Sequence, residues 1–139
     1  MAIIDHLLEF TKSTGQALSA KAASDFRIDF GQEAPTTGMD NQPLYAVFYA
    51  LTAIGGTLTV SLQDCDTEGG SYADVAASAT LTAPVAGTQI VIPMPRHHKR
   101  FVQAYFGGAP SSGTIRGFIT TGLQDNVPPA EAPSVAAVK

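Results

Sequence analysis

Residues 64–69 (Asp-Cys-Asp-Thr-Glu-Gly) are the part of the sequence that most resembles a metal-binding loop. Alternate carboxylates followed by a glycine are typical of an EF-hand calcium loop, where they converge on one ion. The position at which that loop needs a bidentate glutamate holds Val75, and no helical pattern flanks the stretch. The pattern favours a polar β-hairpin loop, with a loosely bound surface cation as the open alternative, and we predict no metal site and no cofactor.

A second candidate is the basic cluster, residues 96–100 (Arg-His-His-Lys-Arg). Successive residues of a strand point to opposite faces, so His97 and His98 make a poor pair of metal ligands. The cluster is either a solvated loop behind the rigid Pro-Met-Pro of residues 93–95 or an electrostatic contact for an acidic protein surface, and these interpretations weigh about equally. Nucleic acid is a distant third, because the cluster stands alone in a chain of formal net charge −4, so we predict no nucleic-acid partner.

The residue patterns of the common catalytic sites are missing from the sequence. The chain has no G-x-S-x-G elbow, no phosphate-binding Gly-Lys-Ser/Thr loop, no H-E-x-x-H and no Cys-x-x-Cys. Cys65 falls at the end of a predicted strand, and we expect a buried or half-buried thiol rather than a nucleophile. Three histidines, two of them adjacent, do not supply the spaced ligands of a cupin-type enzyme. We therefore expect no enzymatic activity.

The composition indicates a folded protein with an uncharged surface. Hydrophobic residues make up 45% of the chain and charged residues 14%, against roughly 25% charged residues in an ordinary soluble domain. Such a surface suits a protein that covers much of its exterior with partners, and we favour this over a merely Thr/Ser-rich skin. The sequence has no run of about 18 apolar residues and no signal-peptide pattern, so we expect no membrane span and synthesis in the cytoplasm.

Period-two alternation predicts a β-rich middle. Residues 25–30 place Phe26, Ile28 and Phe30 on one face, and residues 57–64 alternate in the same way. A nearly continuous apolar run predicts a central strand covered on both faces. Gly/Pro turns at this spacing predict an antiparallel sandwich, jelly roll or small barrel. The run is residues 44–51; the other expected strands are 80–82, 89–92, 100–106 and 114–121, with turns at 55–56, 107–108 and 110–113.

The two ends of the chain differ from this middle. Apolar residues near the N-terminus permit a short helical turn, an irregular arm or an edge strand, and a stable helix is disfavoured because short helices need tertiary support. Residues 128–139 are rich in Pro, Ala and Val, and are expected to be extended or disordered unless a partner orders them. We predict an N-terminal arm (1–22), a β-sandwich domain (23–126) and a Pro/Ala-rich C-terminal tail (127–139).

Several short segments, taken in order, are similar to a known family. They are residues 9–11 (EFT), 15–18 (GQAL), 22–24 (AAS), 28–31 (IDFG), 42–45 (QPLY), 58–64 (LTVSLQD) and 100–106 (RFVQAYF). Their order and spacing, over residues 3–126, resembles the capsid cement proteins of short-tailed phages, of the kind first recognised in a Bordetella phage. This resemblance implies a jelly-roll fold, binding to the outer face of an HK97-like shell, and self-association.

On this basis we predict a capsid cement, or decoration, protein on the exterior of a bacteriophage virion. It would bind an icosahedral head and stabilise contacts between major capsid protein subunits, as a homodimer or alternatively a trimer. We expect the contacts to come from elements that a compact sandwich does not need, including the C-terminal tail. The candidate contact residues are Ile3, Ile4, Leu7, Leu8, Phe10, Arg96, His97, His98, Lys99 and Arg100.

Two alternatives stay open. A carbohydrate-binding or host-adhesion β-sandwich on the virion requires exposed aromatic residues beside acid or amide groups, and the chain has no Trp. The aromatic residues Tyr45, Phe48 and Tyr49 are expected in the core and at interfaces rather than in a ligand site. A head-completion or tail protein would occur as a ring of few copies.

Overall fold

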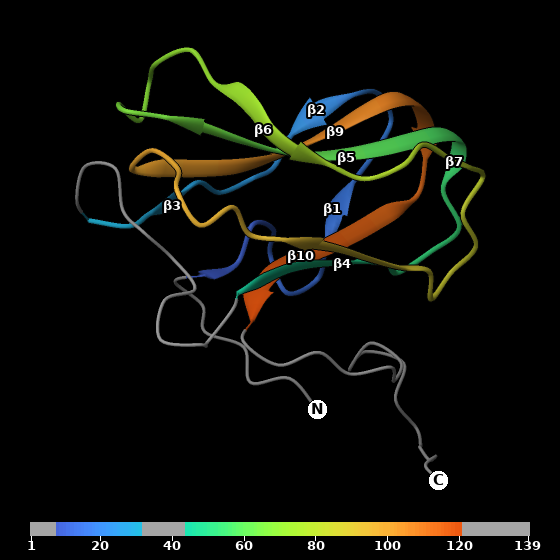
Figure 1. Ribbon diagram of the computed structural model, residues 1–139. Coiled ribbons are helices and arrows are strands. Elements are labelled where there is room, and N and C mark those ends of the chain that lie inside the picture. The colour runs from blue at the N-terminus through green and yellow to red at the C-terminus, as the bar shows by residue number, and fades with distance from the viewer. Residues whose placement is uncertain (1–7, 32–43, 121–139) are drawn as a thin grey trace, which may run out of the picture.

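The computed structural model describes residues 8–31 and 44–120 of the 139-residue chain. The described strands form a four-stranded sheet in the order β1-β10-β4-β8 and a six-stranded sheet in the order β2-β9-β5-β6, in which β3 also pairs with β9 and β7 with β5. Figure 1 shows the two sheets stacked on each other. The strand bounds are β1 Gln16–Ala17, β2 Ala22–Ala23, β3 Ile28–Asp29, β4 Tyr45–Ala50, β5 Gly55–Cys65, β6 Ala73–Ala77, β7 Leu81–Thr82, β8 Gln89–Pro93, β9 Phe101–Ser112 and β10 Thr114–Thr120.

The strand pairing is that of a long hairpin rolled up on itself. β1 pairs with β10, β2 and β3 with β9, β4 with β8, and β5 with β6, all antiparallel. In each sheet, one further antiparallel pair joins two of these pairs. It is β10 with β4 in the four-stranded sheet and β9 with β5 in the six-stranded sheet. This order defines a jelly roll. The prediction of an all-β, jelly-roll-like antiparallel sandwich is therefore confirmed.

A hydrophobic core fills the space between the two sheets. In β5 the predicted alternation holds, since Leu58, Val60 and Leu62 are completely buried. From the opposite sheet, β4 contributes Phe48, whose ring centroid lies 5.9 Å from that of Phe106 on β9. Strand β4 lies between β10 and β8, so residues 44–51 do contain the predicted central strand.

The outer face of the four-stranded sheet carries a smaller apolar cluster. Val47, Tyr49 and Phe118 are buried there, with Tyr45 packed against them. The rings of Tyr49 and Phe118 lie 5.7 Å apart. Alternate residues of β4 therefore pack against apolar neighbours on both faces of the sheet, which explains the continuous apolar run in the sequence.

The turns predicted at the two glycine pairs are wrong. Gly55 and Gly56 open β5, and the second pair lies within β9. Gly56 and Gly108 have φ angles of +79° and +83°, a region that glycine adopts without strain. A Cβ atom at Gly56 would collide with the backbone oxygen of Ala109 across the β5–β9 pair. These glycines thus permit a register shift and a close strand approach, and β9 continues to Ser112.

The strand predicted at residues 25–30 is present only in part. β3 is limited to Ile28–Asp29, with Ile28 buried and Phe30 packed against the core. Phe26 is 43% exposed instead of sharing their face. Its backbone N–H donates to the carbonyl of Phe10 at 3.0 Å, so the chain leaves the alternating strand geometry at this residue.

The described part of the predicted N-terminal arm lies within the sandwich. Phe10 is completely buried and stacks on Phe48 with ring centroids 5.6 Å apart. Leu18 is also buried, and β1 and β2 pair with β10 and β9. Residues 8–31 therefore belong to the jelly roll, and the predicted boundary after residue 22 cuts through it. Residues 1–7 and the tail 127–139 lie outside the described residues.

Candidate interaction surface

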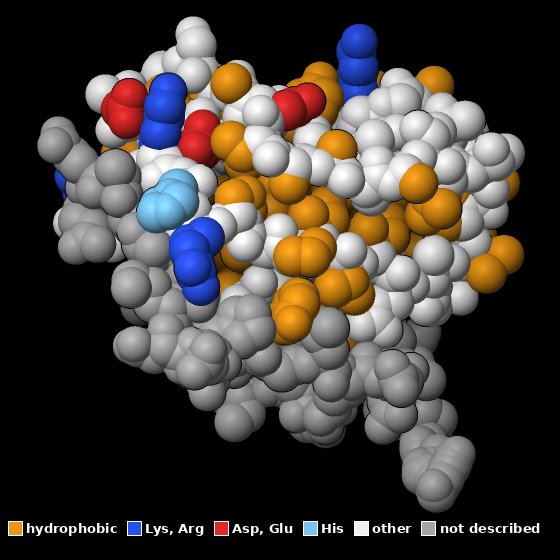
Figure 2. Space-filling view, viewed as in Figure 1, with side chains coloured by type: hydrophobic (Ala, Val, Ile, Leu, Met, Phe, Trp, Pro, Cys, Tyr) orange, Lys and Arg blue, Asp and Glu red, His pale blue; other side chains and the backbone are white. Residues whose placement is uncertain are grey.

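The basic cluster, residues 96–100, lies between β8 and β9. β8 ends at Pro93, whose ring removes a backbone donor from the strand. Met94 still donates its N–H to the carbonyl of Leu44 at 2.9 Å, and the chain then leaves the sheet until β9 begins at Phe101. In Figure 2, the His side chain and most of the visible Lys, Arg, Asp and Glu side chains lie toward the left end of the face shown.

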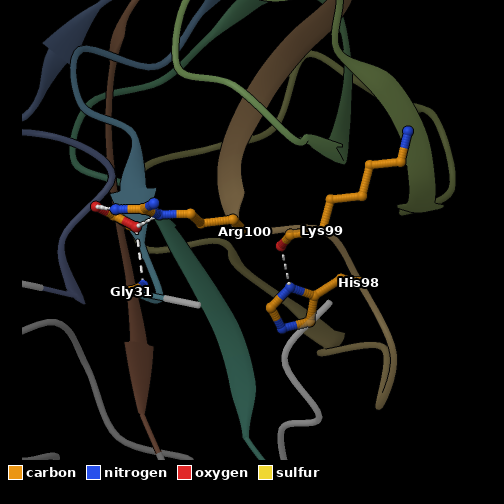
Figure 3. A network of polar contacts seen from close by, with 5 residues as sticks. Gly31, His98, Lys99 and Arg100 are labelled. Atoms are coloured by element: carbon orange, nitrogen blue, oxygen red, sulfur yellow. Dashed lines mark hydrogen bonds and ion pairs between the residues drawn. The ribbon is translucent and has the colours of Figure 1, made fainter. Parts of the chain in front are cut away.

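Arg100 is bound to Asp29 of β3. The Arg100 Nε and Nη2 atoms donate to the two carboxylate oxygens of Asp29 at 2.7 Å and 3.0 Å, and the guanidinium lies over the Phe101 ring at 5.0 Å. Gly31 N–H donates to the same carboxylate at 2.8 Å (Figure 3). The hydrogen bond from Arg100, followed by that from Gly31, lowers the pKa of Asp29 below its usual value. Arg100 therefore joins β3 to the start of β9.

Lys99 and His98 are also engaged within the molecule. The backbone N–H of Lys99 donates to Asp64 Oδ2 at 2.8 Å, while its Nζ lies 3.7 Å from Asp66 Oδ2. His98 is buried, and its ring centroid lies 4.5 Å from that of Phe30. His98 Nδ1 lies 2.7 Å from the Lys99 carbonyl, which only accepts, so this nitrogen is the donor (Figure 3). These contacts fasten the basic cluster to the β5–β6 hairpin and to residue 30.

The cluster is therefore neither a plain solvated loop nor a continuous positive patch. His98 is buried and Arg100 is half-buried in its ion pair, whereas Arg96, His97 and Lys99 are exposed. The Lys99 amine forms an ion pair with Asp66 of the same molecule. A contact with an acidic partner stays a prediction, and it now depends on the three exposed residues.

The apolar candidates at the N-terminus are distributed differently from the expectation. Ile3, Ile4 and Leu7 lie outside the described residues. Leu8 is half-buried and packs against the core, and Phe10 is part of the core. Phe10 is therefore corrected from a contact residue to a core residue, because its completely buried ring has no surface to offer a partner.

The acidic stretch at residues 64–69 forms the hairpin between β5 and β6 as predicted. Asp64 is buried and accepts the hydrogen bond from Lys99, so it is occupied by a structural contact. Cys65 is a buried thiol, as expected. Within residues 8–31 and 44–120, no three His, Cys, Asp or Glu side chains form a group that could hold a metal ion. In the same ranges, no helix is long and apolar enough to cross a membrane.

One buried polar pair was missed by the sequence reasoning. Arg116 of β10 donates to Glu9 at 3.3 Å, and both residues are buried. The Arg116 guanidinium also lies over the ring of Phe118, at 5.6 Å. The alternation of β10 marks Arg116 as an outward-facing residue, but no local signal links it to a glutamate 107 positions away.

These features define a small jelly-roll protein with a charged, internally paired loop at one end. A comparison with protein-family models matches residues 12–122 to the family described as Bbp16, and the chain belongs to this family. The match supports the part of the sequence resemblance that assigns the chain to a Bordetella phage protein family. A comparison with curated proteins found no match.

Proposed function

We propose that this protein is a capsid cement protein that binds the exterior of an icosahedral phage head. It acts there as a homodimer, or alternatively a trimer, that stabilises contacts between major capsid protein subunits of an HK97-like shell. The observation that supports this most strongly is the combination of a jelly roll with membership of a Bordetella phage family. The 14% share of charged residues adds to it, because surfaces that bind proteins are depleted in charge at their centres.

The mechanism follows from mass action on a repeating lattice. A ligand that binds only the assembled, expanded shell stabilises that state relative to every state that it does not bind. A molecule that contacts two neighbouring subunits, or self-associates across them, gains avidity without any stronger single contact. The rigid core described above suits this task, because a preorganised surface loses little conformational entropy on binding.

Sedimentation of the purified protein with purified phage heads tests the proposal. We expect saturable binding to expanded heads at many copies per particle, weak binding to unexpanded heads as the matched control, and a higher temperature of DNA release from decorated heads. Binding in a small fixed number of copies would support a head-completion or tail protein instead. No binding to expanded heads would contradict the proposal.

A glycan-binding role is the second candidate, because one surface has suitable chemistry. On the outer face of the six-stranded sheet, Gln103 donates to Gln63 at 2.8 Å and Gln63 donates to Asp74 at 2.8 Å. Phe101 and Tyr105 flank Gln103 two positions away on the same face of β9. Half-exposed rings beside amide and carboxylate groups are the elements a sugar-binding face needs. A glycan array decides this role, since capsid binding without any glycan signal would exclude it.

A further inference from the structure

The outer face of the six-stranded sheet carries a row of hydrogen-bonded polar side chains. Gln103 of β9 is in register with Gln63 of β5, and Gln63 is in register with Asp74 of β6. The Asp74 carboxylate only accepts, so Gln63 donates to it through Nε2 and accepts from Gln103 through Oε1. The carboxylate thus fixes the orientation of both amides, and Gln103 Oε1 is the acceptor left over at the far end of the row.

Gln103 Oε1 is a buried acceptor that lacks a hydrogen-bond donor. Gln103 is only 5% exposed, and its Oε1 makes no hydrogen bond within the part of the chain that the structure describes. Leaving a buried carbonyl oxygen unpaired is unfavourable. A bound molecule that brings a donor to this atom therefore gains more than it would at an exposed oxygen.

The side chain that spans this row is Arg27. Arg27 precedes β3 at one edge of the sheet, and Tyr72 precedes β6 at the other edge. The Arg27 guanidinium nevertheless lies 5.5 Å from the centroid of the Tyr72 ring. Because the core fills the inner face, this contact passes over the outer faces of β9 and β5, where Gln103 and Gln63 lie. Arg27 therefore lies across the polar row.

Arg27 keeps its hydrogen-bonding capacity for a ligand. It is exposed and, among the described residues, has neither an ion pair nor a hydrogen bond, whereas Arg100 and Arg116 each have a carboxylate partner. A cation–π contact at an exposed site, like that with Tyr72, is weak. A guanidinium binds a carboxylate more strongly, through two parallel hydrogen bonds.

The strand positions beside this row add an aromatic ring and two free hydroxyl groups. Tyr105 lies two positions from Gln103 on the same face of β9, and Ser61 of β5 is its cross-strand partner. The Tyr105 ring is half-buried, and neither hydroxyl forms a hydrogen bond within the described ranges. A ring face beside free hydroxyls suits the apolar face and the hydroxyl groups of a sugar.

We propose that this face binds a carboxylated sugar, which pairs with Arg27 through its carboxylate and donates a hydroxyl to Gln103 Oε1. The inference rests on the glycan-binding role, the second candidate above, and names the ligand class. Pairing with the carboxylate draws Arg27 away from Tyr72 and uncovers Gln103 Oε1. A sugar acid fits better than an acidic side chain of a protein, because an ionised Asp or Glu side chain offers only acceptors, whereas a sugar acid carries hydroxyl donors beside its carboxylate.

Isothermal titration calorimetry of the full chain tests this site. Sialyllactose and trigalacturonate are the carboxylated probes, and lactose is the neutral match of sialyllactose. We expect saturable binding of at least one carboxylated probe, with lactose at least about tenfold weaker than sialyllactose. Arg27→Gln and Gln103→Met should each weaken that binding at least about tenfold, with melting temperatures measured to verify folding. Lys12→Gln, an exposed cation before β1 of the other sheet, is the matched control and should bind as wild type.

Each contrary outcome identifies the step that is wrong. Equal affinity for sialyllactose and lactose, or unchanged affinity in folded Arg27→Gln or Gln103→Met, would overturn the proposed contacts. Tighter binding of a tetraglutamate peptide than of either carboxylated sugar would assign the face to an acidic protein segment and overturn the inference. Failure of both carboxylated sugars to bind would overturn it as well, while sedimentation with phage heads decides the cement function separately.

Discussion

Glu9 and Arg116 form a buried ion pair that fastens the start of the described chain to the last strand. Arg116 Nη2 lies 3.3 Å from Glu9 Oε2, and the two side chains are 10% and 5% exposed. The neighbouring backbone closes the same contact, because Phe10 N–H donates to the Gly117 carbonyl at 2.9 Å and Gly117 N–H donates to Thr11 Oγ1 at 3.1 Å. Residues 9–11 therefore act as part of the four-stranded sheet.

Removal of the Glu9 carboxylate should destabilise the fold. Glu9→Ala leaves the Arg116 guanidinium buried without its counter-charge, and we expect a loss of about 3 kcal/mol in the free energy of unfolding. In urea denaturation, this loss of stability should lower the urea concentration at the midpoint of unfolding and leave the dependence of the unfolding free energy on urea concentration unchanged. Glu68→Ala, at an exposed loop position, is the control and should change stability by less than about 0.5 kcal/mol. Equal stability of the two variants would show that the ion pair has no net effect.

Two N-terminal truncations should separate capsid contact from folding. Deletion of residues 2–10 removes Glu9 and the core residue Phe10. It should lower the free energy of unfolding by about 3–5 kcal/mol or abolish folding. Deletion of residues 2–7 keeps both, so the melting temperature should be maintained while occupancy on heads, counted in a gel of purified particles, falls. If occupancy is unchanged in the shorter deletion, Ile3, Ile4 and Leu7 are not contact residues.

Gly117 is required by the core rather than by its backbone angles. A Cβ atom there would collide with the ring of Phe48, which is enclosed by Phe10 and Phe106. Gly117→Ala should therefore destabilise the protein by about 1–3 kcal/mol through overpacking. Gly69→Ala is the matched control, because a Cβ at that glycine meets no atom within 4 Å. Thermal denaturation should separate the variants, and a Gly117→Ala protein as stable as wild type would mean that the ring shifts freely.

The Asp29–Arg100 pair should make stability sensitive to acid. The pKa of Asp29 is lowered in the folded state, so its stabilising effect is present above the unfolded pKa, about 4, and is lost as the pH falls through the folded value. Asp29→Asn should be less stable than wild type at pH 7, and the difference should shrink below about pH 4. Asp25→Asn, at an exposed position between β2 and β3, is the control for the loss of one carboxylate. If the difference in stability between Asp29→Asn and wild type stayed constant with pH, the stabilising role of the ionised Asp29 carboxylate would be contradicted.

Several strands were predictable because their signal is local. In β5 the apolar residues alternate with a period of two, and a strand with this period must place them all on one face. The long apolar run of β4 likewise predicts a strand covered on both faces, which the apolar neighbours on each face of the sheet confirm. The jelly-roll class itself came from the family resemblance, since alternation does not tell a strand which neighbour it pairs with.

The remaining features depend on partners that are distant in the chain. β1, β2 and β3 span two residues each, too short to show a period, and they form because β10 and β9 offer free edges. The basic cluster could not be interpreted alone, because Arg100 meets Asp29 across 71 positions and Lys99 meets Asp64 across 35. Sequence alternation thus decided which faces are apolar, whereas only the tertiary structure decided which charges are paired internally, because pairing requires proximity that the roll of the chain creates.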